Sequence, residues 1–484
     1  MISETVRRTS EQLLGARGVI TEEAQLRTYE CDGLAGYRVR PALVVLPTTT
    51  EQVAGVVRAC HEAGVPFVAR GSGTGLSGGA LPHADGVLIV LSRMRAVLEI
   101  DLENRFMVVE PGVTNAAISA AVAEHDLYYA PDPSSQQVCS IGGNVAENSG
   151  GVHCLKYGFT TNHVLGLEFV TAQGEVVQLG GPLAETAGYD LRGVVIGSEG
   201  TLGIATKIWV RLLRKPEHVR TLLADFATPT EAGDAVTAIT GEGIIPAGME
   251  MMDNLAMQAC EDDAHVGLNL EAGAVLVVEV DGPEAQVEAE FEAVQRLCRE
   301  AGASDIRIAE DAAERALIWK GRKAAFAAMG RLSRDYFVQD GVIPRTRLGE
   351  VLEQIAELSQ ESGYRVANVF HAGDGNLHPL VLYDGRDEGA ADEAEGVAIK
   401  IVELCVEAGG SITGEHGVGV DKACSMPKMF SEADIDVMLR VRTALDPDGR
   451  CNPGKLFPTP RLCGERPGPY RPHALEEAGL AERL

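Results

Sequence analysis

Apolar and polar positions between residues 41 and 214 alternate between strand-like and helix-like periods, which predicts an α/β region. The region begins with an apolar run at 42–46. Thr48 and Glu51 then have capping-box spacing, and a helix-period apolar stripe continues until Gly64. Further strands are expected at 65–69, 87–91, 97–100 and 106–109, followed by a helix at 115–123.

A second pattern begins at Glu217 and predicts a different architecture. Strands are expected at 222–226 and 274–280, and helices at 231–239, 284–301 and 312–328. This succession favours an antiparallel sheet with helices on one face. Farther along, two apolar runs flank a turn that contains two glycines and Asn376, which predicts strand, tight turn and strand around His371–Pro379.

Length and charge narrow the functional classes. A chain of 484 residues is expected to form two or three domains. The net charge of −28 repels polyanions, so a nucleic-acid partner is disfavoured. An anionic substrate would then need a local basic pocket, for which the run 319–323 is a candidate. Within it we expect Lys320 and Lys323 to face solvent.

Ten dispersed cysteines without a C-x-x-C pair exclude an iron–sulfur cluster or an all-cysteine zinc site held by this chain alone. They are typical of free thiols in a reducing compartment. The first 15 residues lack a secretory apolar stretch, and no segment reaches the ~20 apolar residues of a membrane span. We therefore expect a cytoplasmic protein that reaches a membrane only through a partner.

Three glycine-rich loops lie at 70–79, 131–151 and 196–203. The first contains Gly73-x-Gly75-x-x-Gly78, which matches the dinucleotide fingerprint, but strands rather than a helix follow it, so a Rossmann fold is not expected. Any one loop could be a surface turn. Together they suit a long ligand with a pyrophosphate and a planar ring lying against bare backbone.

His371, His378 and Glu415 form a candidate site for a divalent metal, because imidazole and carboxylate are common ligands of such ions. The alternative is that each histidine is an ordinary polar residue at a strand end, since two histidines separated by six residues do not have a standard zinc spacing.

The loop sequences A-R-G-S-G-T-G-L-S-G-G-A, I-G-G-N with N-S-G-G, and G-S-E-G-T-L-G resemble the FAD-binding domain of the vanillyl-alcohol oxidase and p-cresol methylhydroxylase group. The resemblance implies two α+β subdomains with extended FAD between them. Some members attach FAD through a histidine in the first loop; residues 71–79 contain none, so non-covalent FAD is expected. The FAD-contacting residues that we expect are Arg70, Gly71, Ser72, Gly73, Thr74, Gly75, Ser77, Asp132, Ser135, Gly142, Gly143, Asn144, Ser149, Gly150, Gly151, Gly197, Glu199, Gly200 and Asn452.

The second half resembles the C-terminal domain of FAD-linked 2-hydroxy-acid dehydrogenases, a family that includes the flavin subunit of bacterial glycolate oxidase and the D-lactate and D-2-hydroxyglutarate dehydrogenases. The segments W-x-x-R from residue 319, Q-D-x-x-I-P from residue 339, H-A-G-D-G-N-L-H-P, T-G-E-H-G-V-G and N-P-G-K-L carry this resemblance. It implies oxidation of a small anionic 2-hydroxy acid, with His416 as base, Arg322 on the substrate carboxylate, and zinc or manganese on the three candidate ligands. An iron–sulfur or second flavin subunit would be the electron acceptor.

The expected fold is α+β: a helical lead-in at 1–40, a two-subdomain FAD-binding domain at 41–215, a substrate domain with an antiparallel sheet at 216–458 whose 411–458 end returns to the flavin, and a tail at 459–484. Leu380 and the run 324–326 stand where members that oxidise 2-hydroxyglutarate have polar residues, which favours glycolate or D-lactate. D-2-hydroxyglutarate oxidation is the alternative. A non-redox transferase resembling alkyl-dihydroxyacetone-phosphate synthase, a hydrolase and a flavin-storing subunit are alternatives of other classes.

Overall fold

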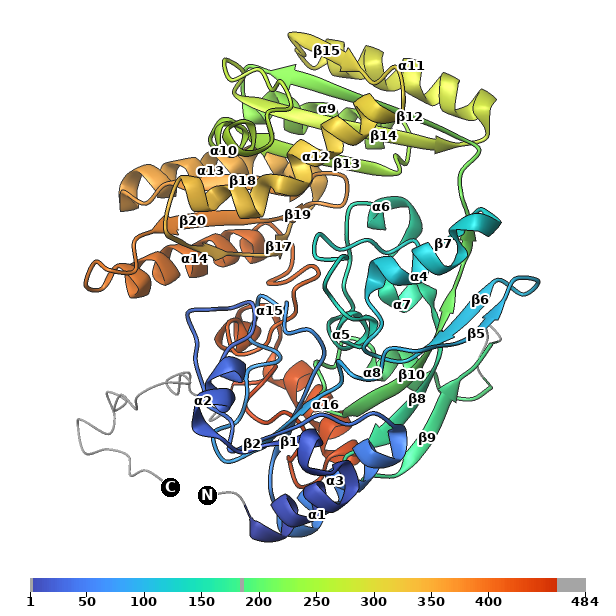
Figure 1. The fold of residues 1–484 in the computed structure, drawn as a ribbon. Coiled ribbons are helices and arrows are strands. Elements are labelled where there is room, and N and C mark those ends of the chain that lie inside the picture. The colour runs from blue at the N-terminus through green and yellow to red at the C-terminus, as the bar shows by residue number, and fades with distance from the viewer. Residues whose placement is uncertain (1–2, 183–186, 459–484) are drawn as a thin grey trace.

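The computed structural model describes residues 3–182 and 187–458, so the expected tail lies outside the described residues. Blue to green elements form the lower region of Figure 1, and yellow-green to orange elements form the upper region. The chain passes between them from β11 (Leu213–Arg214) to β12 (His218–Phe226). We place the proposed domain boundary at this link.

The first subdomain contains a four-stranded sheet in the order β1-β2-β4-β3. Strands β2, β4 and β3 are parallel, and β1 pairs with β2 in the antiparallel sense. The segment before residue 41 therefore contributes a strand to this sheet in addition to helices. The bounds are α1 (Glu4–Leu14), β1 (Val19–Ile20), α2 (Glu23–Leu26), β2 (Leu43–Val45), α3 (Thr50–Ala63), β3 (Phe67–Arg70) and β4 (Val87–Val90).

Helix α3 confirms the predicted apolar stripe and corrects its cap. The hydroxyl of Thr49, not that of Thr48, accepts the N–H of Gln52. Gly64 ends the helix with a left-handed φ of 66°, as its position predicts. Within the described residues no helix separates β3 from β4, so the loop after β3 is not a Rossmann loop.

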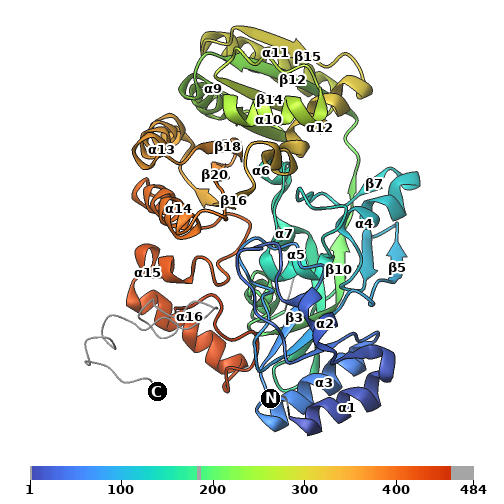
Figure 2. The same cartoon turned by 60° about the vertical axis from the view of Figure 1, so that its left-hand side comes forward.

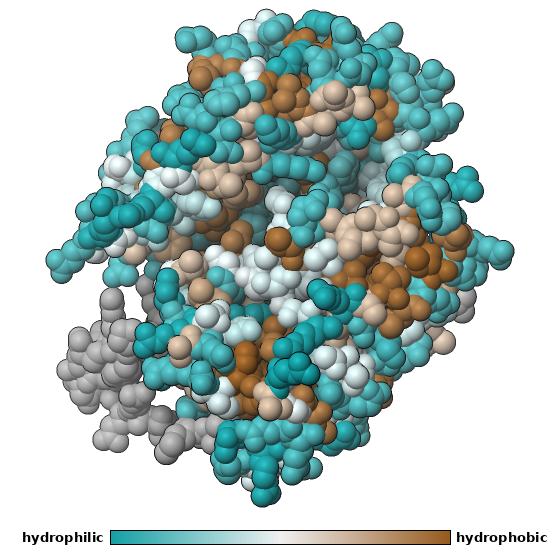
Figure 3. Space-filling view, in the orientation of Figure 1, coloured by the Kyte–Doolittle hydropathy of each residue, from teal (hydrophilic) through white to brown (hydrophobic). Residues whose placement is uncertain are grey.

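The second subdomain contains a five-stranded antiparallel sheet in the order β5-β6-β10-β8-β9, with a helical layer on one face. The bounds are β5 (Val97–Asp101), β6 (Phe106–Val109), α4 (Asn115–Val122), β7 (Leu127–Tyr128), α5 (Ile141–Glu147), α6 (Cys154–Tyr157), α7 (Thr160–His163), β8 (Val164–Thr171), β9 (Val176–Gly180), α8 (Leu191–Val195) and β10 (Gly203–Arg211). Apolar side chains of Val97, Leu98 and Ile100 are at least 40% exposed on β5, and brown surface gathers there at the right of Figure 3.

A nine-stranded sheet forms the upper region, and helices cover both of its faces. Alternate residues of β14 belong to two apolar clusters, one shared with α9, α11 and α13 and the other shared with α10 and α12. The expectation of helices on one face was therefore wrong, because β14 is apolar at nearly every position and must be covered twice. The bounds are β12, α9 (Pro229–Gly241), β13 (Gly248–Asp253), α10 (Asn254–Ala264), β14 (Ala274–Gly282), α11 (Glu284–Glu300), β15 (Asp305–Ile308), α12 (Ala312–Ala328), β16 (Asp335–Val338), β17 (Gly341–Val342), α13 (Leu348–Ser362), β18 (Val366–His371), β19 (Asn376–Leu377), β20 (Pro379–Tyr383) and α14 (Ala390–Glu407).

The hairpin around His371 is present, and its turn differs in one detail from the prediction. Gly375 adopts the positive φ, at 79°, whereas Asn376 already pairs with His371 in β19. Asp374 closes the turn by accepting the N–H of Asn376 at 3.1 Å.

After α14 the chain leaves the sheet and returns to the lower region through α15 (Met426–Met429) and α16 (Glu432–Leu445). Figures 1 and 2 both show α16 among the elements of that region. Cys451 forms a parallel bridge with Phe67 at the end of this path. Among the described residues, no helix is long and apolar enough to cross a membrane.

Candidate active site

An elongated cavity lies between the glycine-rich loops and contains about 920 Å³ of empty space, open solvent included. Several of the lining residues are glycines, so much of the wall is bare backbone. Two of them are also tightly packed, because a Cβ at Gly71 would collide with Ser140 and one at Gly142 with Pro111. Such a wall suits a pyrophosphate and a planar ring, so the residues fit FAD. The expected FAD residues that line it are Arg70, Gly71, Ser72, Gly73, Thr74, Gly75, Gly142, Gly143, Asn144, Ser149, Glu199 and Gly200.

The charged groups of two lining residues, Arg70 and Glu199, form hydrogen bonds with other parts of the protein. The guanidinium of Arg70 donates to the carbonyls of Tyr29 and Ala80. The carboxylate of Glu199 accepts the N–H groups of Val418 and Gly419. Their side chains therefore hold neighbouring segments in place.

The remaining expected residues lie outside the cavity wall: Ser77, Asp132, Ser135, Gly150, Gly151, Gly197 and Asn452. Asn452 donates to the carbonyls of Gly79 and Glu199, and so links two loops. A Cβ at Gly151 would collide with Asp132. Asn452 and Gly151 therefore support the cavity wall without lining it.

The cavity lining also includes side chains that sequence reasoning missed, among them Ser140, Glu147 and Ser198. Ser140 caps α5 by accepting the N–H of Gly143. A serine directly before Ile141 and two glycines is a helix-start signal that could have identified it. Nothing in the sequence distinguishes Glu147 from the other glutamates of the chain.

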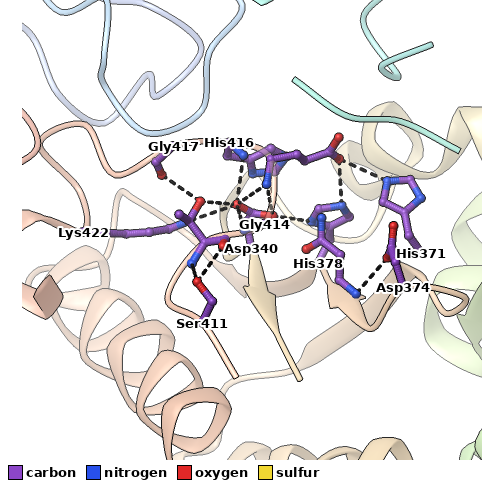
Figure 4. A network of polar contacts seen from close by, with 12 residues as sticks. Asp340, His371, Asp374, His378, Ser411, Gly414, His416, Gly417 and Lys422 are labelled. Carbon is purple, nitrogen blue, oxygen red and sulfur yellow. Dashed lines mark hydrogen bonds and ion pairs between the residues drawn. The ribbon is translucent and has the colours of Figure 1, made fainter. Parts of the chain in front are cut away.

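The candidate metal ligands meet at the turn of the β18–β19 hairpin (Figure 4). Glu415 Oε1 lies 3.1 Å from His371 Nε2 and 3.2 Å from His378 Nε2. The ligand atoms all lie within 4.8 Å of one another, and both histidines are buried. This donor set and spacing suit a divalent cation with room for substrate oxygens.

Glu250 completes this cluster from β13, where it is paired across the sheet with His371. Its Oε1 lies 2.6 Å from His371 Nδ1, and its Oε2 accepts a hydrogen bond of 2.8 Å from Arg322 Nε. A carboxylate on the far nitrogen of a histidine fixes the ring for metal binding. Sequence reasoning missed Glu250, although a lone carboxylate between Met249 and Met251 in an apolar strand is a usable signal.

Arg322 is fully buried, and its guanidinium contacts Glu250 in this structure. The lysines on either side of it are exposed, as expected. Arg322 is thus separated from the candidate metal ligand His371 by the carboxylate of Glu250, with which it is already paired.

His416 stacks on His378 with ring centroids 4.8 Å apart and planes 9° apart. Burial lowers the pKa of His416 to about 4, so its ring is neutral at neutral pH, although it is a weaker base than an ordinary imidazole. Ser77 of the first glycine-rich loop donates to the His416 carbonyl at 2.9 Å. A Cβ at Gly150 would lie 2.6 Å from Glu415 Oε2. The cavity loops therefore touch both halves of the Glu415–His416 pair.

Asp340 holds the Glu415–His416 pair in place. In the sequence it stood out only as part of the Q-D-x-x-I-P segment from residue 339. Its Oδ2 accepts the N–H groups of Gly414 and His416 at 2.9 Å and the hydroxyl of Thr413 at 2.6 Å. Burial opposes its charge, but His416, Lys422 and His378 hold its pKa well below the usual range. Asp340, His378 and His416 form a second group that could hold a metal ion, although Oδ2 of Asp340 already accepts several hydrogen bonds.

Two family models match the chain: the FAD binding domain at residues 41–180 and the C-terminal domain of FAD linked oxidases at residues 215–456. The chain is similar to solved structures of p-cresol methylhydroxylase (TM-score 0.80, 18% identity, 94% of this chain and 97% of that one). It is also similar to alkyldihydroxyacetonephosphate synthase (TM-score 0.72, 18% identity, 93% of this chain and 84% of that one). These two likenesses establish the fold.

Curated relatives are more similar in sequence. Glycolate oxidase subunit GlcD of Escherichia coli K12 is 52% identical, covering 92% of this chain and 90% of its own. The subunit of the same name from Bacillus subtilis is 38% identical, covering 94% and 97%. The mitochondrial D-lactate dehydrogenase [cytochrome] of Arabidopsis thaliana is 32% identical, covering 87% and 74%. The chain therefore belongs to the family of FAD-linked 2-hydroxy-acid oxidases and dehydrogenases.

Proposed function

We propose that this chain oxidises glycolate or D-lactate to the 2-oxo acid, with His416 as base and a divalent ion, zinc or manganese, held by His371, His378 and Glu415. The observation that carries the proposal is the junction at residues 415–416, where the ligand cluster and the neutral His416 contact Gly150 and Ser77 in the glycine-rich loops that surround the FAD cavity. The names of the relatives support a small 2-hydroxy acid as substrate.

Each side chain has a distinct task in this proposal. His416 takes the proton of the substrate hydroxyl at a ring nitrogen, which its neutral state permits. Glu250 holds the His371 ring and the Arg322 guanidinium, and Arg322 attracts the substrate carboxylate. When bound, FAD supplies the hydride acceptor and the divalent ion supplies a Lewis acid.

Apolar neighbours favour a small substrate. Phe326 lies against His378, with ring centroids 5.9 Å apart. Leu380 is fully buried in the core beside α12. A second carboxylate placed there would find no polar partner from these two residues, and an unpaired buried charge is costly.

An electron-accepting partner is part of the proposal. The described cysteines are all free, and none supplies a C-x-x-C pair for a cluster. The Escherichia coli relative is itself named as a subunit. We infer that a separate iron–sulfur or flavin subunit receives the electrons.

Anaerobic mixing with candidate acids tests the proposal. Glycolate or D-lactate should bleach the flavin absorbance of the purified protein faster than 2-hydroxyglutarate does. His416→Ala should retain its flavin spectrum and bleach roughly 10²–10⁴-fold more slowly. Faster bleaching by 2-hydroxyglutarate would overturn the substrate assignment, and loss of FAD from the variant would assign His416 to cofactor binding. A flavin that no hydroxy acid bleaches would favour the non-redox transferase.

A further inference from the structure

Two carboxylates meet beside the FAD cavity, between the first glycine-rich loop and the segment that follows His416. Glu147 and Glu199 both line the cavity. A Cβ at Gly79 would come close to a carboxyl oxygen of each, and so would a Cβ at Gly417. The two carboxyl groups therefore share one small space between these glycines.

Their hydrogen bonds are unequal. The N–H of Val418 donates to Glu199 Oε1 at 2.6 Å, and the N–H of Gly419 donates to Glu199 Oε2 at 2.7 Å. Glu147 Oε2 is buried without a hydrogen-bond partner among the described residues. Donors stabilise an ionised carboxylate, whereas burial without donors favours the neutral acid. A single proton on the pair therefore resides on Glu147.

The surrounding charges act in the same direction. Burial raises the pKa of Glu147 well above its ordinary value, and the charges of Glu199 and Asp32 raise it further, against Lys422 and Lys455. Burial raises the pKa of Glu199 as well, but the two N–H donors and the same lysines lower it. Two carboxylates in one space do not both ionise readily.

We propose that Glu147 is a neutral carboxylic acid that donates a hydrogen bond to the flavin in the cavity, and that the neighbouring Glu199 keeps it neutral. An acid at this position stabilises the negative charge that arrives with a hydride, whereas a carboxylate would oppose it. This role is separate from the proton transfer assigned to His416. It rests on FAD binding and is independent of which 2-hydroxy acid is oxidised.

The reduction potential of the bound flavin tests this role without any hydroxy acid. The full-length holoprotein is reduced slowly with dithionite beside a reference dye, for wild type, Glu147→Leu, Glu147→Gln and the exposed control Glu175→Gln. Leucine removes the donor at similar volume, so the equilibrium with the dye should shift about tenfold toward oxidised flavin, which is ~30 mV for a two-electron couple. Glutamine is neutral and can donate, so it should recover most of this shift.

Each outcome bears on the proposal. A potential in Glu147→Leu equal to that of wild type and of Glu175→Gln would contradict it. An equal shift in the leucine and glutamine variants would contradict it too, because an amide donor should replace the acid. If the leucine variant is isolated without FAD while the glutamine variant retains it, the hydrogen bond is supported by its effect on retention; loss of FAD from both would contradict the proposal.

Discussion

At the scale of single residues, Glu250 joins the two halves of the candidate site. One of its oxygens contacts the ring of His371 and the other contacts Arg322. Burial opposes charge on His371, but Glu250 and Glu415 together raise its pKa well above the ordinary value. Because a buried arginine and a buried histidine both depend on this carboxylate, its removal leaves two polar groups without their partner.

We predict that Glu250→Gln weakens divalent-metal retention by roughly 10–100-fold, the usual effect of losing a carboxylate behind a metal-binding histidine. Metal content after dialysis against graded chelator measures this, with zinc and manganese determined separately. The flavin spectrum should stay intact, because Glu250 does not line the FAD cavity. The exposed Glu388→Gln provides the control. Unchanged metal content in Glu250→Gln would argue against His371 as a ligand.

Motif resemblance could propose the candidate metal ligands and the candidate base, because these residues stand in distinctive runs around glycines. It could not identify Glu250, Glu147 or the anchoring role of Asp340. Each of these acts through a contact with a residue distant in sequence, such as His371 for Glu250, and only the folded chain brings the partners together. Sequence also placed Arg322 on substrate, whereas its contact in the structure is Glu250.

At the scale of elements, the segment 413–416 is held in shape by one carboxylate. Asp340 follows β16 and receives donors from four consecutive residues, Thr413 to His416. Four donors on one carboxylate fix the backbone that presents Glu415 to one side and His416 to the other. The segment is therefore a rigid support, although it lies in a loop.

We predict that Asp340→Asn lowers the rate of flavin bleaching by about 100-fold or more while FAD remains bound. An amide has one acceptor oxygen where the carboxylate has two, and its NH₂ group would face N–H donors, so the segment must shift. Stopped-flow bleaching together with the FAD-to-protein ratio measures this. The exposed Asp392→Asn should behave like wild type. A bleaching rate within threefold of wild type would show that the segment keeps its shape without Asp340.

A second contact between elements joins α6 and its preceding turn to the nine-stranded sheet of the upper region. His153 lies between Asp132 of the second glycine-rich loop, at 3.0 Å, and Glu279 of β14, at 3.4 Å. Burial opposes its charge, but these two carboxylates raise the pKa of His153 to about 10. The protonated ring therefore links the FAD-binding region to the upper sheet.

This link predicts a pH-dependent stability. The unfolded pKa of histidine is ~6.5, so the charge on His153 stabilises the fold fully below that pH and loses its effect as pH rises through about 10. His153→Gln should therefore lower the unfolding temperature by about 2–4 °C at pH 6, and the difference should shrink toward pH 10.5. Scanning calorimetry across this range tests it, with the exposed His125→Gln as control. A difference that grows with pH would contradict the assignment.

At the scale of the whole molecule, the patterns of the sequence predicted most elements, and the resemblance of its motifs predicted the fold family and its FAD-binding loops. Strands β4 and β6 and helices α11 and α12 fall where periodicity placed them. The second helical layer was not predicted, although the nearly continuous apolar run of β14 indicates a strand that is covered on both faces. The strand before residue 41 was also missed, because two residues carry no period.

Asn452, in the segment after α16, connects two loops of the FAD-binding region. Its side chain donates to the carbonyls of Gly79 and Glu199, one in each of two FAD loops. We predict that Asn452→Ala weakens FAD binding by about 30-fold, since two buried carbonyls lose a donor worth ~1 kcal/mol each. FAD fluorescence during dilution measures this, with the exposed Asn104→Ala as control. Unchanged affinity would show that the loops hold their shape without the C-terminal segment.

The bridge from Asn452 to Gly79 spans 373 positions of the chain and has a consequence for biosynthesis. At ~5–20 residues per second, a ribosome needs roughly 20–75 s to make the intervening chain. During that interval the first glycine-rich loop lacks its last support, while the contiguous strands β12 to β20 can already assemble. We expect the upper region to fold first, on the ribosome, and the flavin to bind only after Asn452 has been made and has joined the two loops.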